Sequence, residues 1–257
     1  MILFFIFVIG VSIGSFLNML IYRVPQKISL LSPKRSICPY CKSVIKWYEN
    51  IPLISFAFLK GRCSSCPKRI SLFYPFVELL YGITFLLLFL KFGVSIEFVI
   101  SSFVISVLVV LSMIDIHYKA VPDYLLLIAL VGAFFLSEFS FLYCFVFAGG
   151  AILLEFFVTF YIQNIKVKFT KDESLLNQKA LGEGDIPIFA LIGGVLGLHL
   201  GFIAIFLAAV FAIIPSIVNR IKSGDMELPF IPFLTLGFLI VYLGENTIVL
   251  ILEKLGL

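Results

Sequence analysis

The sequence predicts an all-α, polytopic membrane protein: a bundle of about eight transmembrane helices with a small insert on the cytoplasmic side. Three observations predict this fold class, namely the composition, the grouping of apolar residues into blocks, and the one-sided distribution of basic residues. Of 257 residues, 61% are hydrophobic and 13% are charged, and the mean hydropathy is +1.16. A soluble domain is only about half apolar and about a quarter charged, so this composition excludes a soluble globular protein.

The apolar residues fall into eight blocks. The fourth and sixth blocks are shorter than the roughly 20 residues that cross the hydrocarbon core as a helix. They therefore either extend into their polar flanks or pack inside the bundle. The eight blocks are residues 1–22, 73–90, 96–114, 124–136, 139–162, 186–198, 201–218 and 230–243.

The basic residues predict the orientation in the bilayer. With alternating crossings, all 19 Lys and Arg residues except Lys91 and Lys254 fall on one side. Because cytoplasmic loops are enriched in Lys and Arg, that side is the cytoplasmic face of a bacterial inner membrane, and the N-terminus lies outside. The first block has no preceding positive charge, so it is expected to be a retained anchor. The net charge of +4 thus reflects topology, and the expected partner is the lipid bilayer, with no nucleic acid.

Four of the five cysteines lie between the first two blocks, in residues 23–72. They form two C-x-x-C pairs, Cys38 with Cys41 and Cys63 with Cys66. Two such pairs can hold one zinc ion in a tetrahedral structural site with bonds of about 2.3 Å. The alternative is two disulfides, but cytosolic thiols are kept reduced. We therefore expect one structural zinc ion that organises this loop.

Two acids lie at the cytoplasmic ends of apolar blocks. Asp115 ends the third block, and Asp185 opens the sixth within Gly182-Glu183-Gly184-Asp185. Two carboxyl groups held close together share a proton and titrate as a unit, as in an aspartic protease. Gly182 and Gly184 would let a substrate backbone approach closely.

Each acid also has a structural interpretation. Asp185 can be a helix N-cap, with Pro187 in the first turn, and Asp123 suits the N-cap of the fourth block even better. Asp115 lies at a helix C-terminus, where the macrodipole disfavours an anion. A capping role therefore explains Asp115 least well, and on chemistry alone both interpretations stay open.

Several motifs resemble those of the type IV prepilin peptidases, membrane aspartic proteases with a G-x-G-D motif. Their order in the chain is that of the family. The matching segments are 14–25 (GSFLNMLIYRVP), 38–41 (CPYC), 47–52 (WYENIP), 61–66 (GRCSSC), 74–80 (YPFVELL), 113–115 (MID), 121–123 (VPD) and 182–185 (GEGD).

The resemblance implies that Asp115 and Asp185 are the catalytic pair, with Gly182 and Gly184 as supporting residues of the motif. Substrates would be prepilins and pseudopilins of type IV pili, type II secretion or DNA uptake. They would be cut after the terminal glycine of the leader, at the cytoplasmic face. Many members of the family also N-methylate the new N-terminus with S-adenosylmethionine, and the cysteine loop is usual in those members. Here methylation rests on the resemblance alone.

The resemblance also divides the chain into a first transmembrane helix (1–22), a zinc-binding loop associated with methylation (23–72) and a transmembrane aspartic peptidase domain (73–257). Arg23 and Glu49 match the family pattern and are candidates for the methylation site. Asn18 and Glu78, which are polar groups in or near apolar blocks, either bind the methyl donor or substrate, or hydrogen-bond between helices.

Two positions depart from the family pattern. Many relatives have an acid two residues after the first catalytic Asp, where this chain has His117, and a Lys two residues after the second, where it has Pro187. The first departure favours Asp115 itself as the functional acid. Two other classes of function are a non-enzymatic zinc scaffold and an ion- or proton-coupled transporter. A transporter predicts acids at the bilayer midplane, whereas these two lie at the edge.

Overall fold

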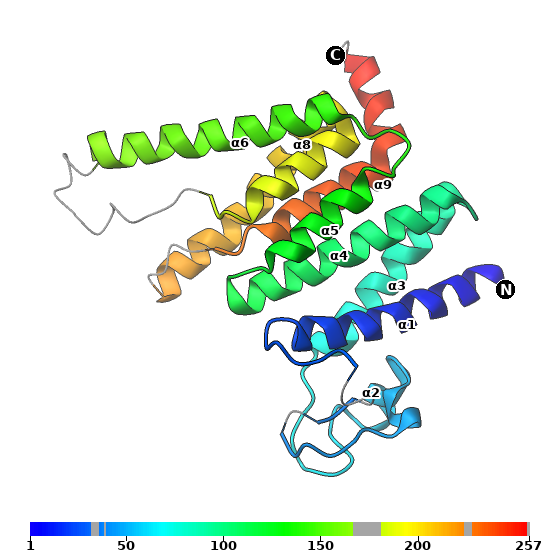
Figure 1. Ribbon diagram of the computed structural model, residues 1–257. Helices are drawn as coiled ribbons and strands as arrows, with labels where there is room; N and C mark the ends of the chain where they lie inside the picture. The colour runs from blue at the N-terminus through cyan, green and yellow to red at the C-terminus, as the bar shows by residue number, and fades with distance from the viewer. Residues whose placement is uncertain (32–35, 39, 167–180, 224–227, 256–257) are drawn as a thin grey trace. The chain divides into compact units, whose positions relative to one another are not determined.

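The computed structural model describes residues 1–31, 36–38, 40–166, 181–223 and 228–255 (Figure 1). Apart from two isolated β-bridges, the regular structure within these ranges is helical. This confirms the predicted all-α class. The chain forms two compact units, residues 1–114 and 115–257, and the division falls near the C-terminal end of helix α4.

Six helices are long and apolar enough to cross a membrane. This length requirement follows from the thickness of the hydrocarbon core, which about 20 helical residues span. Many of their large apolar side chains are exposed, as expected for surfaces that face lipid. The six helices are α1 (Ile2–Arg23), α3 (Phe73–Phe92), α4 (Ile96–Tyr118), α6 (Phe141–Tyr161), α8 (Asp185–Ser223) and α9 (Ile231–Leu255).

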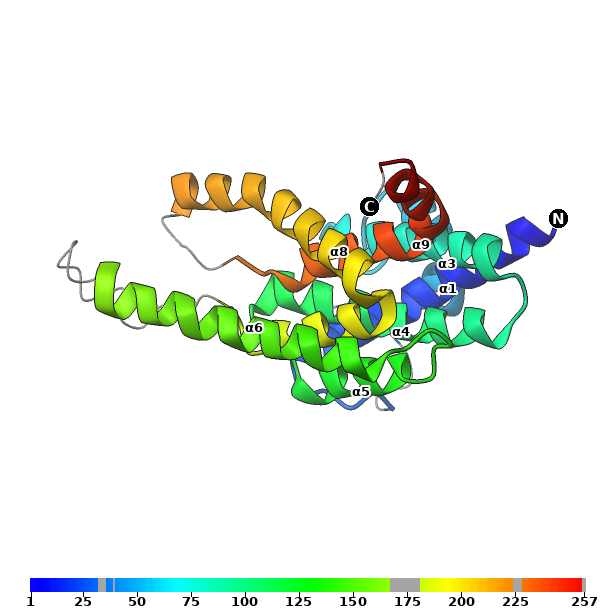
Figure 2. The same ribbon diagram turned by 90° about the horizontal axis from the view of Figure 1, so that it is seen from above.

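The two short blocks correspond to two short helical segments. Helix α5 (Asp123–Ala133) has only 11 residues. Helix α8 is interrupted at Gly197, whose φ of 71° and ψ of −165° are not helical. Figure 2 shows the change in chain direction between the yellow and orange parts of α8. The sixth and seventh predicted blocks are thus two segments of α8, and the break is made by a glycine because φ in this range is unfavourable for other residues.

Helices α1 and α3 of the first unit pack closely against each other (Figure 1). A Cβ atom on Gly10 would lie 3.1 Å from the Cα of Gly82, and one on Gly14 would lie 2.8 Å from the Cα of Glu78. One turn further along, the side-chain amide of Asn18 donates a hydrogen bond to the carbonyl of Tyr74 at 3.0 Å. These contacts step by four residues in opposite directions along the two helices, so α1 and α3 are antiparallel. Glycine is required where the backbones come this close.

In the second unit, α8 packs against both α6 and α9. Gly193 and Gly201 of α8 lie against the ring of Phe147 in α6, and Gly237 of α9 lies against the backbone carbonyl of Ala204 in α8. Small residues at these positions let the helices approach each other closely. This packing fixes the ends of α8 and α9, from which residues of the candidate site come.

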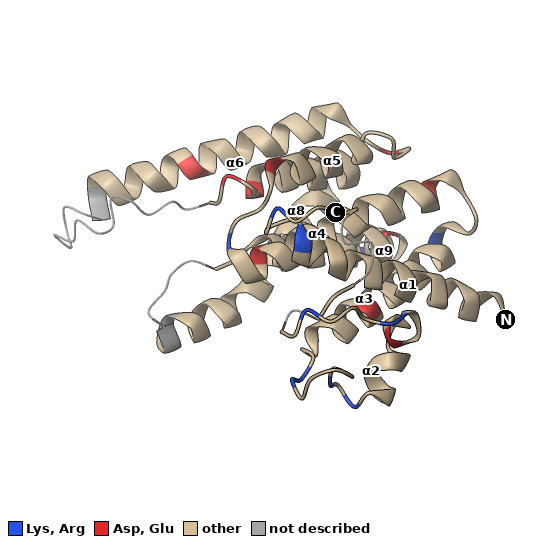
Figure 3. Ribbon diagram, turned by 60° about the horizontal axis from the view of Figure 1, so that its bottom comes forward, with Lys and Arg blue, Asp and Glu red and all other residues tan. Residues whose placement is uncertain are grey.

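The segment between α1 and α3 is mostly loop, with a short 3₁₀ helix η1 (Trp47–Asn50) and a short helix α2 (Ile54–Phe58). Figure 3 shows Lys and Arg residues along these loops. Five of the basic residues on which the predicted orientation depends lie outside the described residues: Lys34, Arg35, Lys168, Lys171 and Lys179.

Candidate functional site

Two buried carboxyl groups lie in the second unit. Asp115 is in the last turn of α4 and is 8% exposed, and Asp185 is the first residue of α8 and is 6% exposed. They are 70 positions apart in sequence, yet Gly184, the neighbour of Asp185, lies against Ile231, whose N–H group binds Asp115. The fold therefore brings the two predicted acids together.

A backbone N–H group from a third helix holds Asp115. Ile231, the first residue of α9, donates its N–H to Oδ2 of Asp115 at 3.2 Å, and this bond is buried. The first N–H groups of a helix have no partner within the helix, and the positive end of the helix dipole favours an anion there. The start of α9 therefore compensates for the unfavourable position of Asp115 near the end of α4.

Asp185 is held by the turn that precedes α8. Gly182 donates its N–H to Oδ2 of Asp185 at 2.9 Å, and the N–H of Asp185 donates to the carbonyl of Gly182 at 3.0 Å. An N-cap carboxylate would instead accept N–H groups from the first turn of its own helix. The carboxyl group of Asp185 thus stabilises the G-x-G-D turn. Asp123 is likewise the first residue of α5 and not its N-cap, a position that Pro122 occupies.

Gly184 lies where the three segments of this site meet. A Cβ atom on Gly184 would lie 2.7 Å from Cγ2 of Val121 and 3.6 Å from Cδ1 of Ile231. Ile231 is the residue whose N–H group binds Asp115. The absence of a side chain at Gly184 therefore lets the G-x-G-D turn pack against both the segment after α4 and the start of α9.

The two departures from the family pattern lie beside the pair. His117 is exposed, although Asp115 two residues earlier is buried. Residues two positions apart face different sides of a helix, so the imidazole points away from the buried carboxyl group. Pro187 lies in the first turn of α8, where a proline costs no hydrogen bond.

The two C-x-x-C pairs of the first unit fold into two matching turns. In each, the N–H of the first cysteine donates to the carbonyl five residues later, from Cys38 to Ser43 at 2.9 Å and from Cys63 to Lys68 at 3.1 Å. In each, a β-bridge joins the residue before the first cysteine to the residue six positions after that cysteine: Ile37 with Val44, and Arg62 with Arg69.

The four sulfur atoms of Cys38, Cys41, Cys63 and Cys66 lie within 4.8 Å of one another, and the cysteines are free. The sulfurs of Cys41 and Cys63 are 3.9 Å apart. Four sulfurs bound to one ion at 2.3 Å would be about 3.8 Å apart. This geometry suits a metal ion and is compatible with zinc, whereas a disulfide requires sulfurs at about 2.05 Å.

The pKa values of these thiols also favour the binding of a cation. Hydrogen bonds with Ser43 lower the pKa of Cys41 to about 6, and a backbone N–H group lowers the pKa of Cys63. A backbone hydrogen bond from Lys68 lowers the pKa of Cys66, but desolvation and hydrogen bonds to the other thiols outweigh it and raise the pKa to about 11. The thiols thus share protons, which a bound divalent cation would displace.

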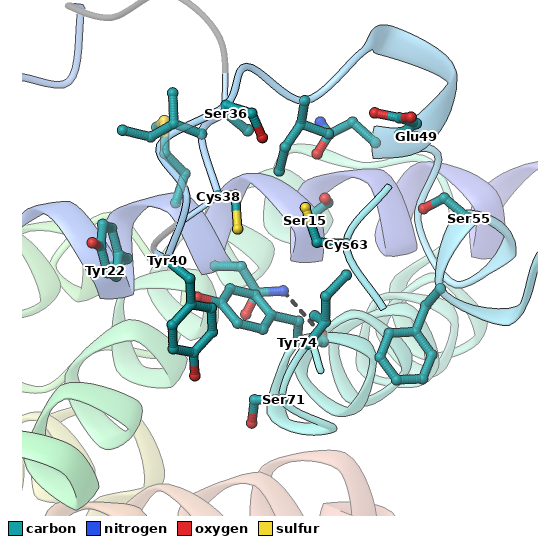
Figure 4. A pocket seen from close by; sticks show the side chains of 18 of the residues that line it. Ser15, Tyr22, Ser36, Cys38, Tyr40, Glu49, Ser55, Cys63, Ser71 and Tyr74 are labelled. Carbon is teal, nitrogen blue, oxygen red and sulfur yellow. Dashed lines mark hydrogen bonds between the residues drawn. The ribbon is translucent and has the colours of Figure 1, made fainter. Parts of the chain in front are cut away.

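A cavity of about 520 Å³ opens beside the cysteine cluster in the first unit (Figure 4). Figure 4 shows side chains from α1, from both cysteine turns and from the start of α3 around it. All four residues that sequence analysis named for methylation line this cavity, although they are spread over 61 positions: Asn18, Arg23, Glu49 and Glu78. The fold therefore gathers them at one place.

The local contacts of these four residues differ. Arg23 donates to the carbonyls of Ser29 at 3.0 Å and Leu30 at 3.2 Å, which fixes the start of the loop. Glu49 accepts the N–H of Lys46 at 3.0 Å, and this bond lowers the pKa of Glu49.

Glu78, which is 8% exposed, accepts the N–H of Leu53 at 2.8 Å. This bond ties the start of α2 to α3. The cavity is also lined by Ser15, Tyr22 and Tyr74, which lie in the family motifs but were not among the residues predicted for methylation. Ser15 and Tyr22 share the face of α1 with Asn18 at helical spacing, a signal that would have found them.

Two family descriptions match the chain. Residues 8–92 match the Bacterial Peptidase A24 N-terminal domain, and residues 102–217 match the Type IV leader peptidase family. A prepilin leader peptidase/N-methyltransferase of Bacillus subtilis is 30% identical over 98% of this chain and 98% of its own. The chain belongs to the type IV leader peptidase family.

Other proteins with the same name also match this chain. The protein of Legionella pneumophila is 32% identical over 93% of this chain and 90% of its own, and that of Myxococcus xanthus is 46% identical over 46% of this chain and 35% of its own. No solved structure matches this chain. As a leader peptidase family member with six candidate membrane helices, the chain is a multi-pass bacterial inner-membrane protein.

The two matched regions divide the site residues of this leader peptidase family member. The region matching the N-terminal domain contains the cysteine cluster and the residues around the cavity, and the region matching the peptidase family contains both Asp115 and Asp185. Two chemically distinct sites thus lie in two regions of the chain.

Proposed function

We propose that this protein is a membrane aspartic endopeptidase that removes the leader from type IV prepilins and pseudopilins, with Asp115 and Asp185 as its catalytic pair. The observation that carries this proposal is the pair itself. Two buried carboxyl groups come from distant segments to one site, and each accepts one backbone N–H group. The names of the relatives support the reaction and the class of substrate.

Such a pair can catalyse hydrolysis of a peptide bond. One carboxylate removes a proton from a water molecule, whose oxygen then attacks the scissile carbonyl carbon. The other carboxyl group donates its proton to the carbonyl oxygen, and a proton finally passes to the leaving amine as the C–N bond breaks. The backbone bonds from Ile231 and Gly182 would hold both carboxyl groups in position for these transfers.

The basic residues support a cytoplasmic location for this chemistry. The loop between α1 and α3 carries positive charge, as cytoplasmic loops do, so the proposed orientation has this loop in the cytoplasm and the N-terminus outside. We retain the division into a first helix (1–22), a metal-binding loop (23–72) and a peptidase domain (73–257) as part of this proposal.

The cavity of the first unit supports a second activity, N-methylation of the new N-terminus. Its volume of about 520 Å³ is in the range of small-molecule sites, and relatives are named N-methyltransferases. S-adenosylmethionine would supply the methyl group as an electrophile. Asn18, Arg23, Glu49 and Glu78 would bind and orient the reactants, and one zinc ion on the four cysteines would keep the two turns that line the cavity in place.

Comparing Asp115→Asn and Asp185→Asn with wild type tests both activities. Asparagine keeps the size of aspartate but cannot take up a proton, so each change should slow prepilin cleavage by about 10²- to 10⁴-fold. Each reaction is followed in detergent or liposomes, by the mobility of the cleaved pilin and by transfer of labelled methyl groups to a pre-cleaved pilin peptide. Methylation of that peptide should be unchanged, because neither acid lines the cavity.

Asp123→Asn is the matched control, because Asp123 is an exposed acid at the start of a neighbouring helix. It should cleave at the wild-type rate. Near-normal cleavage by either Asp115→Asn or Asp185→Asn would show that the residue is structural and would restore the scaffold interpretation. A wild-type protein that transfers no methyl group would contradict the second activity and leave the first intact.

A further inference from the structure

Asn18 carries a buried hydrogen-bond acceptor that no group in the described structure satisfies. The side chain is 5% exposed and lines the cavity beside the cysteine cluster. Its Nδ2 donates to the carbonyl of Tyr74 at 3.0 Å, the dashed line of Figure 4, whereas its Oδ1 has no partner among the described residues. A buried polar atom without a partner is costly, so such an atom in a cavity wall points to a ligand.

The orientation of this amide follows from its surroundings. The carbonyl of Tyr74 can only accept a hydrogen bond, so the nitrogen of the amide must face it and the oxygen must face elsewhere. The contacts at Gly10 and Gly14 fix the backbone of α1 against α3, and the bond to Tyr74 holds the amide of Asn18 in place. Oδ1 is therefore a positioned acceptor.

A buried carboxylate lies one helical turn away on the same pair of helices. Glu78 follows Tyr74 by four residues in α3 and faces Gly14 of α1, so the two contacts are separated by about 6 Å along the helices. Oε2 of Glu78 accepts the N–H of Leu53. This wall of the cavity thus presents an amide oxygen and a negative charge.

Such a wall selects a ligand group that carries several N–H donors and a positive charge. A primary amine has both properties, and each reactant of an N-methylation carries one. The methyl acceptor has the new N-terminal amine of the cleaved pilin, and the methyl donor has the α-amine of its methionine part. An adenine ring or a carboxylate would leave the negative charge of Glu78 unbalanced.

We propose that Oδ1 of Asn18 accepts a hydrogen bond from the primary amine of a reactant bound in this cavity, with the carboxylate of Glu78 supplying the opposite charge. This inference rests on the proposed methyltransferase activity for the identity of the ligand. It adds the chemical group that is recognised and the atom that recognises it.

The experiment compares ligands that differ in the amine, in binding measurements on the full-length protein in detergent. One pair is a pre-cleaved pilin peptide with a free N-terminus and the same peptide N-acetylated. The other is S-adenosylhomocysteine, which has the α-amine, and methylthioadenosine, which lacks the amino-acid part. We expect wild type to bind one amine-bearing ligand about tenfold more tightly than its partner, and Asn18→Leu, similar in size, to lose that preference.

The matched control is Ser102→Ala. Ser102 carries the other buried side-chain atom without a partner among the described residues, but it does not line the cavity. Ser102→Ala should keep the preference of wild type, and the thermal unfolding midpoint should show that both variants are folded. If Asn18→Leu does not fold, Asn18→Ser, which keeps a shorter hydroxyl acceptor, should show a reduced preference.

The two pairs of ligands identify which reactant Asn18 binds. If Asn18→Leu loses the preference for the free peptide, Asn18 binds the amine of the pilin. If it loses the preference for S-adenosylhomocysteine, Asn18 binds the amine of the methyl donor. An unchanged preference in folded Asn18→Leu, or an equal loss in Ser102→Ala, overturns the inference, as does the absence of either preference in wild type. If wild type prefers the free amine through Asn18 but transfers no methyl group, the methyltransferase proposal fails and the amine site remains.

Discussion

The two units of this protein hold their functional groups by different means. In the second unit, backbone N–H groups of Ile231 and Gly182 hold the two carboxyl groups, and a glycine provides the space between segments. In the first unit, Asn18, Arg23 and Glu78 also bind backbone groups, but the two turns that line the cavity are in addition brought together by a four-cysteine cluster. The aspartate pair should therefore depend on helix packing, whereas the cavity should depend on a metal ion. The two activities should respond to different perturbations.

Loss of the metal should produce the largest difference between the effects on methylation and on prepilin cleavage. In the double variant Cys41→Ser and Cys63→Ser, two of four ligands are lost, and the binding energy of a structural zinc ion is folding energy for its loop. We expect methylation to fall by about 10²-fold or more while prepilin cleavage stays within about threefold of wild type. Zinc content by atomic absorption, with both activity assays, measures this.

Cys144→Ser is the control for the loss of a thiol, since Cys144 is a free cysteine in α6 and is not one of the four cysteines of the cluster. It should retain both zinc and methylation. A metal-free double variant that methylates normally would show that the cavity does not need the ion.

A smaller effect, confined to cleavage, should follow Gly184→Ala. The added Cβ would lie 2.7 Å from Cγ2 of Val121, so one of the two segments must shift. Overpacking of this kind costs about 1–3 kcal/mol, and we expect cleavage to slow by about 10- to 100-fold. The initial rate of prepilin cleavage is the measurement.

The double variant Gly184→Ala and Val121→Ala removes the methyl group that causes the clash and should recover most of the rate. Gly182→Ala, whose Cβ would meet the carboxyl group of Asp185 at 3.3 Å from Oδ2 and 3.7 Å from Cγ, should lose less than Gly184→Ala. If removal of the Val121 side chain gives no recovery, close packing at Gly184 is not the cause.

The smallest effect should come from removal of one backbone donor. Ile231→Pro removes the N–H group that binds Asp115 at the first position of α9, where proline is tolerated. Ile231→Ala also shortens the buried side chain but keeps the N–H group. A hydrogen bond to a charged group contributes about 1.5–3 kcal/mol, so Ile231→Pro should cleave about tenfold more slowly than Ile231→Ala. Equal rates in the two variants would show that this bond does not hold Asp115 for catalysis.

Features that depend on local sequence could be predicted. The apolar blocks predicted the membrane helices, because about 20 apolar residues must form a helix that satisfies its own backbone hydrogen bonds in lipid. The two C-x-x-C pairs predicted the cysteine cluster, because each pair forms its turn from neighbouring residues. The motifs around Asp115 and Asp185 predicted the carboxyl pair and the family.

Tertiary structure alone decided which groups the site residues contact. The bond from Ile231 to Asp115 joins residues 116 positions apart, and the contact of Gly184 with Val121 joins segments on either side of α5 and α6. The break at Gly197 and the unsatisfied oxygen of Asn18 likewise depend on how helices pack. The sequence by itself determined which residues carry the chemistry and where the helices run. Which backbone N–H group binds which carboxylate was decided by the folded chain, because such donors are common to almost all residues and only three-dimensional packing selects one.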